Sequence, residues 1–160
     1  MSTATRVAQP SDLTAALEVW RRANAARGKT PGPDRVARVQ AKLADPTGLV
    51  IVAERAGELV GMAAAEPGRA EDGAGGVVPG LCHISMVFVR PDHWGKRIGE
   101  LLLDAVREEA LRQGHTSLQL WTGQGNDRAL RLYDRTGFRP SGRTGRLSTG
   151  ERIVHLTRSL

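Results

Sequence analysis

The chain has 160 residues, and its composition is that of one folded domain. Hydrophobic residues make up 40% and charged residues 25% of it, proportions that allow a buried core and exclude wholesale disorder. The formal net charge of +6 favours a polyanionic partner, either nucleic acid or a phosphate-bearing cofactor, without choosing between them. We therefore expect a single domain over residues 1–160.

Membrane, secretory and metal-binding classes are disfavoured by the sequence. No stretch approaches the roughly 20 apolar residues that span a bilayer, and the N-terminus lacks the apolar run of a secretory signal. The single cysteine, Cys82, excludes an internal disulfide, and the four histidines lack clustered metal-ligand spacing. These features predict a cytoplasmic protein with no metal and no membrane association.

The first third of the chain predicts a short extended segment at 5–8 and two helices. Ser11 caps the first helix, which ends by about Gly28, and Asp34 caps the second, which Asp45-Pro46 closes. The positions expected to face inward at helical spacing are Leu13, Leu17 and Trp20, then Val36, Val39 and Leu43.

The pattern then changes to short apolar runs. Residues 49–53 and 59–64 flank Ala56-Gly57 and predict an antiparallel hairpin. Residues 66–80 are rich in Gly, Ala, acidic residues and Pro, which predicts a mobile loop, either an ordinary hairpin loop or a substrate lid. The most apolar strand follows at 81–89.

The second half predicts two further helices and three strands. A helix runs from near Lys96 to Gly114, a strand covers 117–122, a helix covers 126–135, and a hairpin pairs 138–145 with 151–157. The inward positions of the first of these helices are Ile98, Leu101, Leu102, Ala105 and Val106. The order β-α-α-β-β-β-α-β-α-β-β predicts an α+β, or mixed α/β, fold with helices covering one sheet.

The turn that follows the strand at 81–89 is a candidate phosphate site. Its backbone N–H groups and the dipole of the next helix favour an anion such as a pyrophosphate. Lys96 and Arg97 can add charge, while Gly95 and Gly99 allow close backbone approach. Neither GxxxxGK[ST] nor GxGxxG is present. The alternative is an ordinary strand-to-helix turn.

The helix at 126–135 carries a second candidate pair. Asn126 and Tyr133 are seven residues apart, so on a helix they share one face at a spacing of about 10.5 Å along the axis. An amide and a phenol on one edge suit a long, thin ligand. The alternative is a capping Asn and a core Tyr.

Together these two segments resemble the GNAT superfamily of acyl-CoA-dependent N-acyltransferases. The family helix pattern N-x-x-A-x-x-L-Y-x-x-x-G-F is matched at every specified position from Asn126 to Phe138. The family cofactor signature, Q/R-x-x-G-x-G/A, is matched less well, because Trp94 replaces the usual Gln or Arg and Arg97 replaces the middle Gly. The predicted element order is also that of the family, so the resemblance covers nearly the whole chain.

The resemblance implies a central mixed, mostly antiparallel sheet and acetyl-CoA as cosubstrate. In the family, acetyl-CoA lies where the strands corresponding to 81–89 and 117–122 splay apart. The positions that correspond to cofactor-binding residues are Val87, Phe88, Val89, Trp94, Gly95, Lys96, Arg97, Ile98, Gly99, Asn126, Arg128 and Tyr133.

The resemblance also suggests catalytic roles. The Val87 N–H would donate to the thioester carbonyl, and Tyr133 would point at the sulfur. His83 is our candidate base, because it lies on the strand face opposite the apolar residues Cys82, Ile84, Met86 and Phe88. Glu66 or a water chain is the alternative base, and His83 is otherwise a structural histidine. We expect Cys82 to be a packed thiol rather than a nucleophile.

The expected function is transfer of an acetyl group from acetyl-CoA directly to an amine of a small molecule or peptide. Two alternatives stay open: a non-catalytic acyl-CoA sensor, and a basic module that binds nucleic acid or the ribosome. Six aromatic residues in 160 give no stacking stripe of the kind that single-stranded nucleic acid requires, so we expect no specific nucleic-acid binding. Homodimers are frequent in the family, and the acceptor amine is left open.

Overall fold

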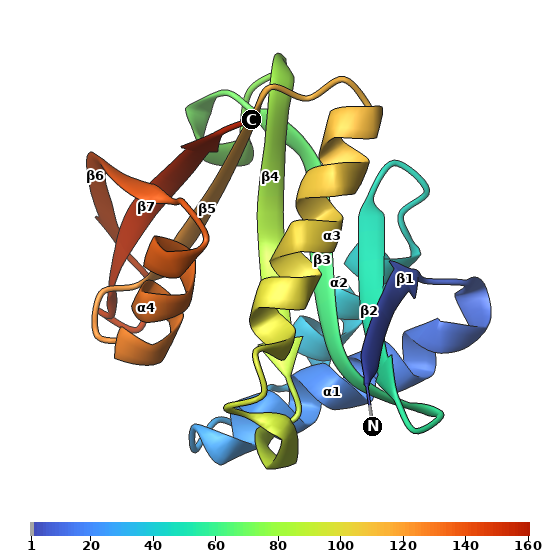
Figure 1. Ribbon diagram of the computed structural model, residues 1–160. Coiled ribbons are helices and arrows are strands. Elements are labelled where there is room, and N and C mark those ends of the chain that lie inside the picture. Colours follow the sequence, from blue (N-terminus) through green and yellow to red (C-terminus); the bar gives the residue numbers. More distant parts are fainter. Residues whose placement is uncertain (1) are drawn as a thin grey trace. The chain divides into compact units, whose positions relative to one another are not determined.

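The computed structural model describes residues 2–160, which form a mixed α+β fold (Figure 1). The described residues contain four α-helices and a seven-stranded sheet with the strand order β1-β2-β3-β4-β5-β7-β6. The strands are β1 (Thr3–Val7), β2 (Leu49–Arg55), β3 (Glu58–Arg69), β4 (Val77–Val89), β5 (Ser117–Gly123), β6 (Arg139–Arg146) and β7 (Arg152–Ser159). The helices are α1 (Leu13–Ala26), α2 (Pro33–Ala44), α3 (Ile98–Arg112) and α4 (Asp127–Arg135).

Strand pairing confirms the predicted fold class. The pairs β1–β2, β2–β3, β5–β7 and β6–β7 are antiparallel. The pair β4–β5 is parallel, with Leu81 opposite Ser117, Cys82 opposite Leu118 and His83 opposite Gln119. A parallel pair needs a long crossover connection, and α3 supplies it. The predicted splaying of β4 from β5 stays a prediction.

The chain divides into two compact units. The first comprises residues up to 66 together with 86–106, and the second comprises residues 67–85 together with 107–160. Each of β3, β4 and α3 contributes residues to both units. Among residues 2–160, no helix is both long and apolar enough to cross a membrane.

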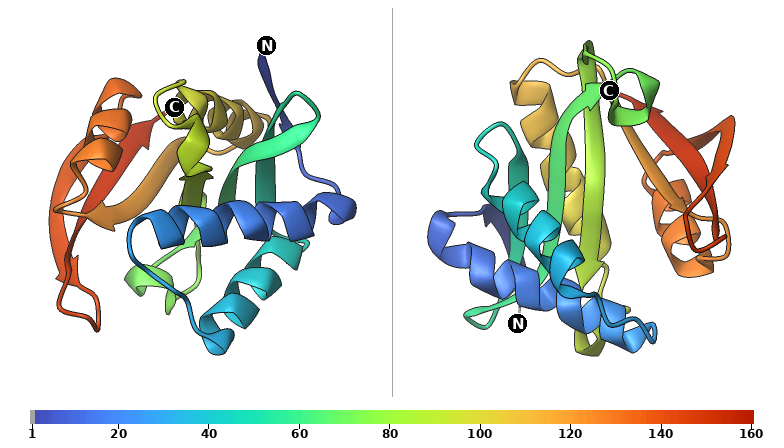
Figure 2. Two further views of the ribbon diagram at one scale, coloured as in Figure 1. Left: turned by 90° about the horizontal axis from the view of Figure 1, so that it is seen from below. Right: turned by 180° about the vertical axis from the view of Figure 1, so that it is seen from behind.

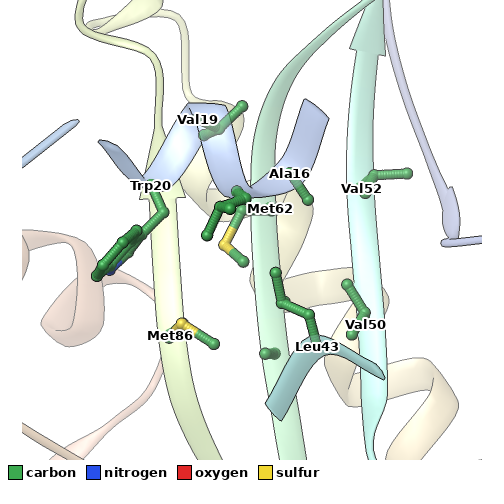
Figure 3. Packing of buried hydrophobic residues seen from close by; sticks show 10 residues of the cluster. Ala16, Val19, Trp20, Leu43, Val50, Val52, Met62 and Met86 are labelled. Carbon is green, nitrogen blue, oxygen red and sulfur yellow. The ribbon is translucent and has the colours of Figure 1, made fainter. Parts of the chain in front are cut away.

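The first unit has apolar packing on both faces of its strands. On one face, residues of α1 and α2 pack against alternate residues of β2 and β3 and against Met86 of β4 (Figure 3). This cluster comprises Ala16, Leu17, Val19, Trp20, Leu43, Val50, Val52, Met62, Ala64 and Met86. On the opposite face, a Cβ added at Gly61 would lie 3.1 Å from side-chain atoms of Ile98 and Leu102. The start of α3 therefore packs closely on that face, and Figure 2 shows it on the side of these strands opposite to α1 and α2.

The second unit separates apolar and polar groups onto the two faces of β5 and β7. Leu118 and Leu120 are buried, and Leu120 lies opposite the buried Leu156 of β7. Because side chains alternate along a strand, Gln119 and Trp121 share the other face with their partners Thr157 and His155. Polar side chains thus collect on one face of this unit.

Both predicted helix caps are wrong. A 3-10 turn at Pro10–Asp12 precedes α1, and Asp12 takes the N-cap position in place of Ser11. In α2 the N-cap is Gly32 rather than Asp34, because Pro33 occupies the first helical position. Proline favours that position since its φ is preset and it lacks the N–H group that would have no acceptor there. Asp34 lies in the first turn, where its charge favours the helix dipole.

The loop predicted at 66–80 is shorter in the structure, because strands occupy both of its ends. β3 continues to Arg69 and β4 begins at Val77, which leaves only residues 70–76 as the connection. Gly68 and Gly80 lie in the two strands, where the absence of a Cβ allows close packing. A Cβ at Gly68 would clash with Leu81, and one at Gly80 would lie 2.7 Å from Thr116 Oγ1.

The inward face of α3 differs from the prediction at one leucine. Ile98, Leu102 and Val106 are buried as expected, but Leu101 is 39% exposed and the neighbouring Leu103 is buried. The helix begins at Ile98 rather than near Lys96, and its buried stripe follows the i, i+4 row from Ile98. Leu101 therefore lies outside the core.

Because Leu102 is buried and Leu101 is partly exposed, replacing them should lower the free energy of unfolding by different amounts. Leu102→Ala should lower the free energy of unfolding by about 3 kcal/mol, because it leaves a cavity in a packed core. Leu101→Ala should lower it by less than about 1 kcal/mol, since its side chain is partly exposed. Urea denaturation followed by circular dichroism measures both, and equal losses would contradict the orientation of α3.

Candidate active site

The turn after β4 presents exposed backbone at the start of α3. Gly95, Lys96 and Arg97 are exposed, and Gly95 has a φ of 82°. The first turn of a helix leaves its N–H groups without intrahelical acceptors and carries partial positive charge. This segment can therefore bind an anionic group through its backbone.

Arg97 adopts the conformation that glycine usually supplies. Its φ is 60°, which lies in the left-handed region that costs a residue with a Cβ roughly 1–2 kcal/mol. Its guanidinium lies 3.7 Å from Glu100, and the side chain is 79% exposed. Arginine at this position thus keeps a glycine-like turn at the expense of backbone strain.

Trp94 connects the turn to the end of β4. Its indole Nε1 donates a hydrogen bond of 2.8 Å to the Val89 carbonyl oxygen. This internal donor uses one lone pair of the carbonyl of Val89, a position that the resemblance assigns to cofactor binding. Any ligand contact at Val89 must use the remaining lone pair or the N–H.

Strand β4 alternates as predicted. Cys82, Ile84 and Met86 are buried, whereas His83, Ser85 and Val87 are intermediate in exposure. The Cys82 thiol, at 3% exposure, is a packed group. His83 therefore lies on the more accessible face, where proton transfer to a ligand is feasible.

His83 is the first member of a chain of hydrogen bonds across four strands. Gln119 Nε2 lies 3.2 Å from His83 Nδ1, and Gln119 Oε1 lies 2.9 Å from His155 Nε2. Ser141 Oγ lies 2.8 Å from His155 Nδ1. Sequence reasoning missed Gln119, His155 and Ser141 because the register that brings them together is a tertiary property.

The environment of His155 favours its neutral form. Burial lowers its pKa, as do the charge of Arg143 and, more weakly, His83, while Asp72 acts in the opposite direction. Arg143 forms an ion pair with Asp72, and its guanidinium lies 5.4 Å from the Trp121 ring centroid. His155 is only 4% exposed.

Helix α4 carries the Asn–Tyr pair, and its first member is the cap. Asn126 Oδ1 accepts a hydrogen bond of 3.2 Å from the Ala129 N–H. The backbone of Asn126 is not helical, with φ −89° and ψ 76°. The direction of this side chain is therefore set by capping, not by the helical period used in the sequence argument.

Tyr133 is buried beside Phe138. The ring centroids lie 5.6 Å apart in an edge-to-face arrangement, and Tyr133 is 8% exposed. Burial raises the pKa of the Tyr133 phenol to about 12. The phenol is therefore a hydrogen-bond donor throughout the physiological pH range.

Glu66 and Arg128 lie in different electrostatic surroundings. The Glu66 carboxylate lies 2.8 Å from the Lys42 ammonium, which stabilises its charged form. The pKa of Arg128 is lowered, first by partial burial and then by the charge of Arg131. An anion bound near Arg128 and Arg131 would reduce the repulsion between their two positive charges.

A separate cavity of about 360 Å³ contains none of the predicted site residues. It lies in the first unit, and its lining includes Asp12, Glu18, Glu58 and Arg90. These carboxylates pair with Arg6, Arg22 and Arg90, respectively. Among residues 2–160, no three His, Cys, Asp or Glu side chains gather so as to hold a metal ion.

Comparison with known proteins identifies the family. A sequence model described as the acetyltransferase (GNAT) family matches residues 14–138. The chain belongs to this family. The enzymes of the GNAT family transfer acetyl groups, and the match includes both the turn after β4 and helix α4.

Individual relatives agree with this assignment. The chain is 32% identical over 98 residues to the mycothiol acetyltransferase of Propionibacterium freudenreichii, covering 59% of this chain and 28% of that protein. It is 31% identical over 107 residues to an uncharacterized N-acetyltransferase of Schizosaccharomyces pombe, covering 66% of this chain and 61% of that protein. The chain spans from about a quarter to about three fifths of the length of the curated relatives it matches.

Solved structures share the GNAT fold over nearly the whole chain. The ribosomal-protein-S18-alanine N-acetyltransferase from Escherichia coli has a TM-score of 0.77 at 20% identity, covering 99% of this chain and 94% of that one. A putative acetyltransferase from Salmonella typhimurium, solved with its cofactor acetyl-CoA, has a TM-score of 0.75 at 23% identity, covering 100% of this chain and 95% of that one.

The strained turn predicts a stabilising substitution. Arg97→Gly should raise the free energy of unfolding by about 0.5–1 kcal/mol, because relief of the left-handed strain exceeds the entropic cost of glycine. Arg97→Ala is the matched control, since it also removes the exposed contact with Glu100 but keeps the strain. Chemical denaturation measures both, and equal stabilities of the two variants would contradict the strained conformation.

Proposed function

We propose that this chain transfers the acetyl group of acetyl-CoA directly to an amine of a small molecule or peptide. The observation that carries the proposal is the turn at 94–99, whose backbone keeps a glycine-like conformation at Arg97 within a chain that belongs to the GNAT family. A turn built at the expense of strain indicates a functional requirement for its geometry. We also propose that residues 1–160 act as one domain.

The backbone N–H groups of Gly95, Lys96, Arg97, Ile98 and Gly99 would bind the pyrophosphate of acetyl-CoA. The side chains of Lys96, Arg97 and Arg128 would add charge-assisted contacts. Residues 95–97 suit the pyrophosphate because they are exposed. Arg128 suits it because its positive charge lies close to that of Arg131.

The pantetheine arm would bind along β4. Val87, Phe88 and Val89 would provide backbone partners, with the Val87 N–H directed at the thioester oxygen as that atom gains negative charge. Asn126 uses its Oδ1 atom as a helix cap, so we assign the ligand contact to its Nδ2 amino group. Trp94 would support these contacts by holding the turn against Val89.

Tyr133 would donate a hydrogen bond to the leaving sulfur. With the phenol pKa near 12, complete proton transfer to a thiolate of ordinary pKa would be uphill by roughly 3.5 pKa units, or about 5 kcal/mol. A hydrogen bond to the developing thiolate carries no such penalty. The role of Tyr133 is thus stabilisation of charge on sulfur.

His83 would accept the proton of the attacking amine. As the nitrogen lone pair forms the new N–C bond, the C–S bond breaks with its electrons on sulfur, and the amine proton passes to the imidazole. Glu66 is the alternative base, but its ion pair with Lys42 lowers its availability. An imidazole is the side chain whose protonation changes most readily near neutral pH, which suits it to this task.

The two competing functions make different predictions for thiol release and for RNA binding. A non-catalytic sensor would bind acetyl-CoA without releasing thiol, and a nucleic-acid module would bind RNA in a salt-dependent way without using the coenzyme. We expect thiol release from acetyl-CoA in the presence of at least one amine or peptide of a broad panel. Absence of release with every acceptor, together with tight RNA binding, would overturn the proposal.

Replacement of Tyr133 tests the role of the phenol. Tyr133→Phe should lower kcat about 10²-fold, the low end of general-acid effects, with little change in the affinity for acetyl-CoA. Thiol release gives kcat and calorimetry gives affinity. Unchanged turnover on an accepted amine would remove Tyr133 from the mechanism.

The two candidate bases are distinguished by pH dependence. His83→Ala should abolish the acidic limb of the kcat/KM profile of acetyl transfer, because the group that must be neutral is gone. Glu66→Gln should leave that limb in place. A profile that is unmoved by His83→Ala, or abolished by Glu66→Gln, would assign the proton to another group.

A further inference from the structure

The hydrogen bonds around Gln119 impose a restriction on two histidines. A glutamine amide has one donating end and one accepting end, and here Nε2 faces His83 Nδ1 while Oε1 faces His155 Nε2. The ring that faces the amino group must present a lone pair. The ring that faces the carbonyl must present an N–H.

An imidazolium presents an N–H at both of its nitrogens. If both rings were charged, one of them would direct an N–H at the amino group of Gln119, and that part-buried hydrogen bond would be lost. One glutamine therefore satisfies one charged ring at most.

We propose that Gln119 is a positioning residue for His83. Its single amide joins His83 to His155 and allows only one of the two rings to be charged at a time. The orientation of the amide also selects which nitrogen of His83 carries hydrogen. In the observed orientation Nδ1 of His83 accepts, so neutral His83 carries its proton on Nε2. Rotation of the amide by half a turn places Oε1 at His83 Nδ1, and Nε2 of His83 then accepts a proton.

The surroundings decide which ring takes the charge. His155 is buried and faces the charged Arg143, which is partly balanced by Asp72, and it is linked to His83 through Gln119. Its outer nitrogen contacts Ser141 Oγ, a hydroxyl that can either donate or accept and so tolerates both tautomers. The proton therefore goes to His83, and His155 acts as its neutral partner.

The same environment argues against Ser141 as a nucleophile. Activation of the hydroxyl would require His155 to take its proton and become charged. Burial and Arg143 both oppose that charge. Ser141 thus completes the hydrogen-bond chain at the exposed β6 strand.

The inference rests on the proposed function only for the use of His83 as a base, and its test has a readout that does not need activity. Ring ¹⁵N chemical shifts of the intact protein report the protonation of each histidine separately. As pH falls from about 8 to about 5, we expect His83 to become doubly protonated while His155 keeps one ring proton. Double protonation of both rings in this range, with independent midpoints, would overturn the proposal.

Gln119→Glu is the decisive variant, because a carboxylate accepts from both rings. We expect both rings to become charged, with both midpoints raised by about one pH unit or more. Gln113→Glu is the matched control: it adds the same charge at an exposed position of the same unit and should leave both midpoints within about 0.3 pH units, because screening weakens distant charges. Unchanged midpoints in Gln119→Glu would also overturn the proposal. If this variant does not fold, the titration of the wild-type protein still tests the proposal.

The pH dependence of acetyl transfer separates the coupling of the two histidine rings from the role of His83 as the base. If His83 is the base, the acidic limb of acetyl transfer in Gln119→Glu moves to higher pH together with the His83 midpoint. Ring shifts that behave as expected without a change in the acidic limb would confirm the coupling of the two rings. They would then remove His83 as the base and so overturn that part of the proposed function.

Discussion

The pleat of β4 is the constraint on which the rest of the structure depends. Side chains alternate between the faces of a strand, so burial of Cys82, Ile84 and Met86 directs His83, Ser85 and Val87 to the other face. A slip of one residue would place His83 in the apolar core and expose the cysteine. Core packing and candidate chemistry are thus fixed by the same register.

Much of the fold was predictable because it depends on local periodicity. The hairpin around Ala56-Gly57 and the buried stripes of α1 and α2 follow from apolar spacing, and both are confirmed. Local signals failed where a neighbour competed with them. Pro33 displaced the cap predicted at Asp34, and strand pairing extended β3 into a glycine-rich segment that resembled a loop.

The candidate site was predictable only in part. His83, Tyr133 and the turn at 94–99 are marked by a strand face and by sequence motifs. The partners of His83 are not, since Gln119, His155 and Ser141 lie on three other strands and no sequence pattern encodes their register. The left-handed conformation of Arg97 was likewise hidden, because only the backbone reveals that an arginine occupies a glycine-like position.

The claim that acetyl-CoA binds to this chain is tested most directly by calorimetric titration of the protein with the coenzyme. The account predicts a saturable heat with a dissociation constant well below about 1 mM, and a melting temperature that rises with ligand concentration as mass action requires. No heat and no thermal protection at millimolar coenzyme would contradict it.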